Sequence, residues 1–160
     1  MGKRVTFSVS ARTTATPEVV YRLLATGVTW PEWSPIGSFR LGREGSGGGE
    51  TVGAIRVFKT GTVTSREELL ELRPLQGISY SALSGLPIRA HRADVEIERS
   101  DRSTAIEWRE DFETKYPGTA WLVEHFLRHF VQRCADGLAR HAADLPAGEA
   151  TTADHGLEAS

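Results

Sequence analysis

The order of local patterns along this chain is its most constraining feature, because two amphipathic helix patterns enclose a run of strands. The first helix pattern follows Thr16, and the second is one long stretch from Trp121 to about Leu145. Between them, strand-like segments are separated only by short turns, which indicates an antiparallel meander. A sheet of this kind can curl around a single long helix and leave a hollow between the two.

The N-terminal segment predicts a strand followed by a capped helix. Residues 3 to 13 alternate between apolar and polar side chains, the period of a half-buried strand. Thr16 is a suitable N-cap, Pro17 fits the first helical position, and Glu18 complements the positive end of the helix dipole. Gly27 is the expected end of this helix.

Composition limits the class of protein. The chain has 160 residues, enough for one domain with a core, and a formal net charge of −2, which gives no basic surface for nucleic acid. The single cysteine, Cys134, excludes an internal disulfide. No apolar run reaches the ~20 residues of a membrane span, and no apolar signal segment follows the N-terminus. We therefore expect a cytoplasmic monomer or homodimer that neither binds nucleic acid nor inserts into a membrane.

Later segments predict six further strands, a loop and a tail. The expected strands are residues 39–41, 51–59, 61–72, 77–83, 88–98 and 103–113. The glycine-rich residues 42–49 predict a mobile loop. Residues 1–145 are expected to form one domain, and residues 146–160, which have no amphipathic pattern, a disordered tail.

The inward-facing sets of two strands stay open. Arg56 turns inward if residues 52, 54 and 58 form the inner set, and outward if residues 53, 55 and 57 do. Glu67 turns inward together with Leu69; if residues 70 and 72 are inward instead, residues 66 and 68 take its place. A period of two cannot decide between these alternatives.

Six segments together match a known arrangement. They are residues 3–13 with the helix at Thr16–Tyr21, residues 30–33, residues 53–57, the strand around Tyr80, residues 104–108, and the terminal helix. This arrangement resembles the START-like superfamily of polyketide cyclases/dehydrases and lipid-transport proteins, also called SRPBCC or helix-grip proteins, over residues 3 to 143. The resemblance implies an α+β helix-grip fold: about seven curved antiparallel strands around a long C-terminal helix, with two short helices after the first strand. No catalytic motif carries over residue by residue.

Period-two alternation gathers candidate site residues on one concave face. If the apolar residues of the later strands face inward, the same face carries Tyr80, His91, Trp108 and Glu110. A few convergent polar groups in an apolar pocket orient a ligand. His91 and Glu110 are also candidate catalytic groups, a base and an acid acting on an enolisable polyketide carbon. Alternatively, both lie near strand ends and pair with Arg89 or Arg109.

The aromatic turn and the last helix supply the remaining candidates. Trp30 either stacks on a flat ligand or joins Trp33 in a packed plug, which is the favoured role of Trp33. Phe126 lies on the aromatic face of the last helix, and His129 at the border of its apolar stripe, near the expected cavity rim. His125 and His129 share a helix face but lack the glutamate of zinc-protease motifs and a third ligand, so we expect no metal and no cofactor.

Three functional hypotheses follow. The favoured one is non-covalent binding of a hydrophobic, aromatic or polyketide-like small molecule. The alternative is an aromatase-type polyketide cyclase/dehydratase that uses pocket acid and base groups. The third is a ligand-responsive interaction module, in which the glycine-rich loop or an apolar patch at the pocket mouth contacts a partner.

Overall fold

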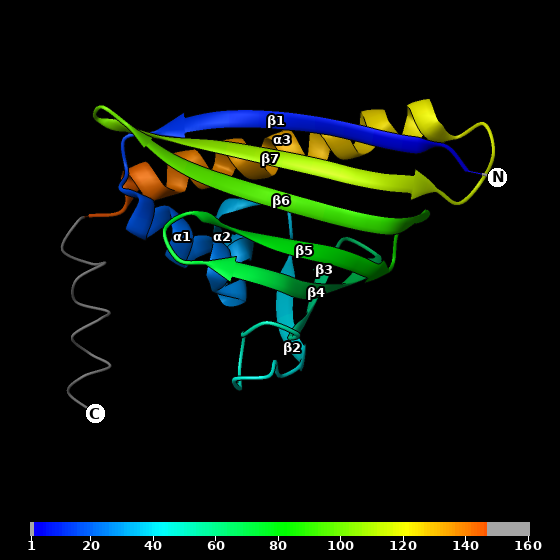
Figure 1. Cartoon of the computed structure of the whole chain (residues 1–160), viewed down its shortest axis with the longest axis horizontal. Coiled ribbons are helices and arrows are strands. Elements are labelled where there is room, and N and C mark those ends of the chain that lie inside the picture. Colours follow the sequence, from blue (N-terminus) through cyan, green and yellow to red (C-terminus); the bar gives the residue numbers. More distant parts are fainter. Residues whose placement is uncertain (1, 147–160) are drawn as a thin grey trace.

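Seven strands form one antiparallel sheet in the computed structural model, which describes residues 2–146 (Figure 1). The strands are β1 (Arg4–Thr13), β2 (Ser38–Arg43), β3 (Ile55–Thr60), β4 (Val63–Arg73), β5 (Gly77–Ser84), β6 (Ile88–Ser100) and β7 (Ser103–Thr114). Their order is β1-β7-β6-β5-β4-β3-β2. Strands β2 to β7 are the predicted meander, and β1 pairs with the last strand.

The helices are α1 (Pro17–Ala25), the 3-10 turn η1 (Gly27–Thr29), α2 (Trp30–Trp33) and α3 (Ala120–Asp144). As predicted, the Thr16 hydroxyl caps α1 by accepting a hydrogen bond from the Val19 amide, at 3.5 Å. The helix ends at Ala25, before Gly27, because Thr26 is extended and its amide closes the last turn on the Arg22 carbonyl. Together with the sheet, these helices confirm the predicted helix-grip fold.

Helix α3 lies along β1 and β7, and its C-terminal end reaches α1 and α2 (Figure 1). Gly137 faces α2, where a Cβ atom would lie 1.8 Å from the Trp33 carbonyl oxygen. The missing side chain therefore permits close approach of α3 to the end of α2 rather than to the sheet. The predicted tail, residues 146–160, lies outside the described residues except for Pro146.

The structure decides both open registers. Arg56 points into the core with Ala54 and Phe58, and its side chain is 0% exposed. Glu67 lies opposite Arg56 in the β3–β4 pairing and shares its face with the buried Leu69. The pattern was ambiguous because both faces of β3 are buried: Ile55 and Val57 are as well covered as Phe58.

The glycine-rich loop between β2 and β3 is hydrogen-bonded to itself and to the core. Within it, the Gly45 amide donates to Gly49 and the Ser46 amide to Val52. At its end, a carboxylate oxygen of Glu50 accepts from the Gly27 amide at 2.8 Å and lies 3.6 Å from the Arg56 guanidinium. The loop thereby supplies a counter-charge for a buried arginine.

Candidate functional site

An aromatic cluster fills the part of the concave face beneath α2. Trp30 is 2% exposed, and its ring centroid lies 4.6 Å from that of Trp33 and 5.0 Å from that of Phe58. Tyr80 and Trp108 meet Trp30 edge-on, at 6.3 and 5.7 Å. The Trp30 indole N–H donates to the Leu24 carbonyl at 3.1 Å. These rings pack on one another, so Trp30 and Trp33 form a plug in the core.

Five polar side chains cross the concave face beside this cluster, one from each of the neighbouring strands β3 to β7. They form what we call the polar belt: Arg56, Glu67, Tyr80, His91 and Glu110. Arg56, Tyr80, His91 and Glu110 are buried, and Glu67 is half-buried. Buried polar groups are usually fully hydrogen-bonded. Belt atoms that lack a hydrogen-bond partner in the protein therefore mark where a ligand or solvent is needed.

His91 and Glu110 are hydrogen-bonded to each other at 2.9 Å, between Nε2 and Oε1. The Ala82 amide donates to His91 Nδ1 at 2.7 Å. In the neutral ring this contact fixes the tautomer, so that Nε2–H donates to Glu110. Burial acts to lower the pKa of His91, but the hydrogen bond to Glu110 and its charge outweigh that effect, and the net result is a raised pKa.

Four belt atoms are buried without a hydrogen-bond partner in the described part of the chain: Arg56 Nε and Nη2, Glu67 Oε1 and Glu110 Oε2. Arg56 is held by its other nitrogen, Nη1, which donates to the Leu24 carbonyl at 2.9 Å. Its guanidinium also lies 4.8 Å from the Trp30 ring centroid. A buried polar group left unpaired costs about 1–3 kcal/mol. Solvent or a ligand is the remaining source of partners for these atoms.

A cavity of about 140 Å³ lies between the β3–β4 hairpin and the first half of α3. It is lined by Ile36, Thr60, Val63, Ser65, Glu67, Leu86, Phe126, Leu127 and Phe130. Apart from Glu67, these side chains are apolar or neutral. The cavity is thus an apolar chamber with one member of the polar belt, Glu67, in its wall.

The carboxyl group of Glu67 has an unusual proton affinity. Burial raises the pKa of Glu67 to about 7, although the nearby charges of Arg56 and His91 act to lower it. The charge of Glu110 raises it further. Near neutral pH, Glu67 therefore exists in both protonation states and can either donate or accept a proton.

Apart from Trp30, which lies in the aromatic cluster, the ligand-binding residues predicted from sequence fall into three groups. Phe126 lines the cavity. Tyr80, His91, Trp108 and Glu110 lie on the concave face as expected, but they are not among the residues that line this cavity; Trp108 donates its indole N–H to the Tyr80 hydroxyl at 3.1 Å. His129 is exposed and does not line the cavity.

Sequence reasoning missed Glu67 and Arg56 as site residues. Both lie at positions where period-two alternation allowed two registers, so their inward orientation was not assigned. The available signal was an arginine in β3, a strand with apolar residues on both faces, and a glutamate at the facing position of β4. Opposite charges at facing positions of a hairpin favour that pairing.

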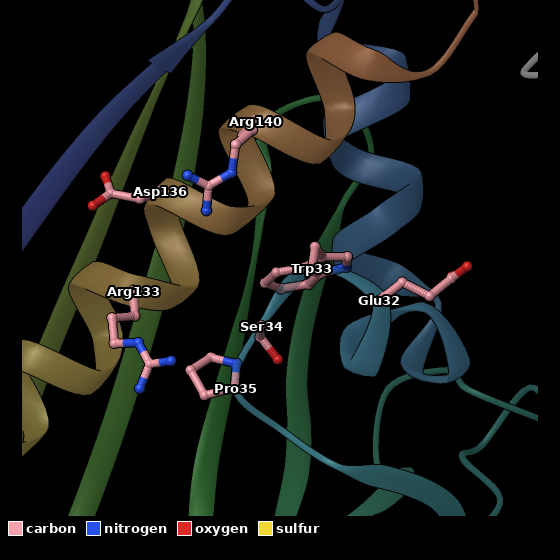
Figure 2. A pocket seen from close by; sticks show the side chains of 7 residues that line it. All are labelled: Glu32, Trp33, Ser34, Pro35, Arg133, Asp136 and Arg140. Carbon is pink, nitrogen blue, oxygen red and sulfur yellow. The ribbon is translucent and has the colours of Figure 1, made fainter.

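A second hollow, of about 350 Å³, lies on the outer surface between α2 and α3 (Figure 2). Arg133 extends beside Pro35, whereas the carboxylates of Glu32 and Asp136 point away to opposite sides (Figure 2). None of the buried unpaired atoms found in the described residues belongs to this hollow. The cavity at Glu67 is therefore the stronger candidate for a ligand site.

Within residues 2–146, no group of three or more His, Cys, Asp and Glu side chains is arranged to hold a metal ion. None of the helices in this part of the chain is long and apolar enough to cross a membrane.

Comparison with known proteins supports the predicted relationship. The family described as polyketide cyclase / dehydrase and lipid transport matches residues 4–145. No curated protein matches the chain. Among solved structures, a START superfamily protein from Mycobacterium smegmatis is 15% identical with a TM-score of 0.73, covering 88% of this chain and 99% of its own.

Two other solved structures show the same fold. The protein XoxI from Bacillus cereus is 18% identical with a TM-score of 0.71, covering 88% of this chain and 96% of its own. The major latex-like protein 151 from Panax ginseng is 15% identical with a TM-score of 0.69, covering 89% and 99%. At these identities the likeness concerns the fold alone.

Proposed function

We propose, since this chain belongs to the polyketide cyclase/dehydrase and lipid-transport family, that it binds a small hydrophobic molecule in the cavity beside Glu67. The observation that carries the proposal is an apolar chamber with one carboxyl side chain in its wall, Glu67, which has a buried oxygen without a hydrogen-bond partner. Apolar walls with a few placed polar groups are what ligand sites have in common.

The volume of the cavity limits the ligand. An apolar cavity of about 150 Å³ holds a benzene molecule, whereas pockets for drug-sized ligands measure about 300–1,000 Å³. At about 140 Å³, this cavity accommodates one ring or a short acyl chain. Among the hydrophobic ligands expected for the fold, its size favours a single aromatic ring over an extended polyketide.

The expected affinity follows from buried area. An aromatic ring group buries about 150–250 Å². At about 25 cal/mol per Å², this contributes about 4–6 kcal/mol. An unsubstituted ring should therefore bind with a Kd between about 1 mM and tens of micromolar. Hydrogen bonds to the polar belt would add to this.

The entrance is formed by the first half of α3. Phe126 lines the cavity and is nevertheless 65% exposed, so it lies at the mouth. On the preceding turn, Trp121 and Leu122 are also largely exposed. A displacement of this half of α3 would widen the mouth for a ligand larger than one ring.

An environment-sensitive apolar dye tests the proposal. We expect one dye molecule to bind per chain with enhanced fluorescence and to be displaced by toluene. Ser65→Trp, which fills the cavity, should weaken binding at least tenfold, because Ser65 is one of the lining residues. The control is Thr64→Trp on the opposite, exposed face of β4. Equal dye binding by the two variants would refute this site.

A proton-transfer enzyme, the cyclase/dehydratase alternative, is favoured by one specific observation. Glu110 accepts a hydrogen bond from His91 through Oε1 and keeps Oε2 free, while burial brings the pKa of Glu67 to about 7. Two carboxyl groups in contrasting environments can serve as base and acid. Glu110→Gln should then lower turnover of a short β-keto substrate by at least 100-fold. Unchanged turnover in that variant would remove Glu110 from any catalytic role.

A further inference from the structure

Glu67 is the one charged side chain among the described residues that line the cavity. Its Oε1 atom is buried and has no hydrogen-bond partner within residues 2–146. The other walls include Ile36 and Leu86, and α3 contributes Leu127 and two phenylalanines. A molecule that fills this chamber therefore finds one charged hydrogen-bond acceptor, Glu67, in a wall that is otherwise apolar or neutral.

Groups from every neighbouring element act on this carboxyl group. The charges of Arg56 on β3 and His91 on β6 lower the pKa of Glu67, and the charge of Glu110 on β7 raises it. Glu67 in turn influences Tyr80 on β5 and Cys134 on α3, since its charge raises the pKa of both groups. Arg56 directs its Nη1 hydrogen bond to the Leu24 carbonyl and not to Glu67, whose Oε1 stays without a partner.

We propose that Glu67 is the polar anchor of the cavity and that it selects a small hydroxylated aromatic ligand, of the phenol class, over an unsubstituted ring of the same size. This inference rests on the proposed function and specifies its ligand class. A ring fills a chamber of about 140 Å³, and its hydroxyl supplies a hydrogen-bond donor to the carboxyl group of Glu67. A site built to hydrogen-bond a hydroxyl discriminates strongly against the analogue that lacks it.

The charges around Glu67 favour a neutral hydroxyl over an ammonium group. The guanidinium of Arg56 is buried and belongs to the residue that faces Glu67 across the β3–β4 pairing. Its charge already acts on Glu67 and lowers the pKa of the carboxyl group, so Glu67 needs a hydrogen-bond donor rather than a second cation. A phenolic O–H, whose pKa is about 10, donates a hydrogen bond without bringing a charge.

Phenol and toluene form a matched probe pair, because they differ only in a hydroxyl and a methyl group. Their Kd values are measured by calorimetry for the wild-type chain, Glu67→Met, Glu67→Gln and the control Glu68→Gln, whose carboxylate faces Arg43 at 3.6 Å. We expect the preference for phenol over toluene to fall at least tenfold in Glu67→Met and to be unchanged in Glu68→Gln. The same preference in all four proteins would overturn the inference.

A pH series on the wild-type chain tests the same point without a substitution. Because the pKa of Glu67 is about 7, the ionised acceptor becomes dominant between pH 6 and pH 8. Phenol affinity should rise up to about tenfold over this range, while toluene affinity should not rise. Glu67→Gln should abolish the rise. A phenol affinity that is flat with pH in the wild-type chain would contradict the role of Glu67.

The outcomes separate this inference from the function on which it rests. If neither probe binds the wild-type chain, the cavity does not take ring ligands, and both the proposed function and the anchor fail. If both probes bind and their ratio is insensitive to Glu67 and to pH, the cavity binds ring ligands but Glu67 does not select them.

Discussion

The two halves of α3 differ sharply, although one apolar stripe runs through both. In the C-terminal half, from Val131 to Asp144, the buried residues include Cys134, Ala135, Leu138 and Ala142. In the N-terminal half, from Ala120 to Phe130, Leu127 is buried, whereas Trp121 is 73% exposed. The C-terminal half is covered by α1 and α2, while the N-terminal half borders the cavity (Figure 1). The same pattern thus serves a packed core at one end and the wall of a cavity at the other.

The largest expected difference in stability is between the alanine variants of two leucines of this stripe. Leu138 is 0% exposed in the C-terminal half, and Leu122 is 53% exposed in the N-terminal half. Leu138→Ala should destabilise the fold by about 3 kcal/mol, because it removes packed methyl groups and leaves a void. Leu122→Ala should cost about 0.5 kcal/mol or less. Urea unfolding measures both, and comparable losses would mean that the N-terminal half is packed as tightly as the other.

A second contrast uses the close contact at Gly137. Gly137→Ala places a methyl group against the Trp33 carbonyl, so α2 and α3 must separate. We expect a loss of about 2 kcal/mol, despite the better helix propensity of alanine. The matched control is His125→Ala on an exposed position of the N-terminal half, which should change stability by about 0.5 kcal/mol or less. A stabilised Gly137→Ala variant would show that the two helices are not pressed together.

The smallest expected effect concerns the carboxyl group opposite the N-terminal half. The folded state raises the pKa of Glu67 from 4.5 to about 7, so it holds that proton more tightly than the unfolded chain does. This contribution to stability is complete below pH 4.5 and is lost as the pH rises through 7. The full shift corresponds to about 3 kcal/mol, which partial exposure of the side chain reduces to about 1–2 kcal/mol.

The measurement compares wild-type and Glu67→Gln unfolding at pH 5 and pH 8. From pH 5 to pH 8, the wild-type chain should lose about 1–2 kcal/mol relative to the variant, whose amide does not titrate. Using the difference between the two proteins removes the effect of other titrating groups. If the difference stays constant across this range, the carboxyl group is solvated in the folded state.

Most of the fold was predictable because its signals are local. The N-cap at Thr16 and the alternation of β1 each depend on a few consecutive residues, and the structure confirms both. The boundaries were less certain: the strand expected at residues 51–59 begins at Ile55, since residues 44–54 fold back on themselves through loop hydrogen bonds. The candidate site was only partly predictable. Alternation placed His91 and Glu110 on one face, but it could not show that they bond to each other at 2.9 Å.

The sequence alone determined which segments become strands and helices, because hydrophobic period, caps and turn residues act over a few positions. It also determined that α3 carries one apolar stripe. The tertiary structure alone decided which part of that stripe is covered and that Arg56 and Glu67 turn inward opposite each other. Both outcomes depend on how elements that are far apart in the sequence pack against one another. Side chains of α1, of α2 and of both faces of a strand compete for the same buried positions, and no local pattern decides which of them is buried.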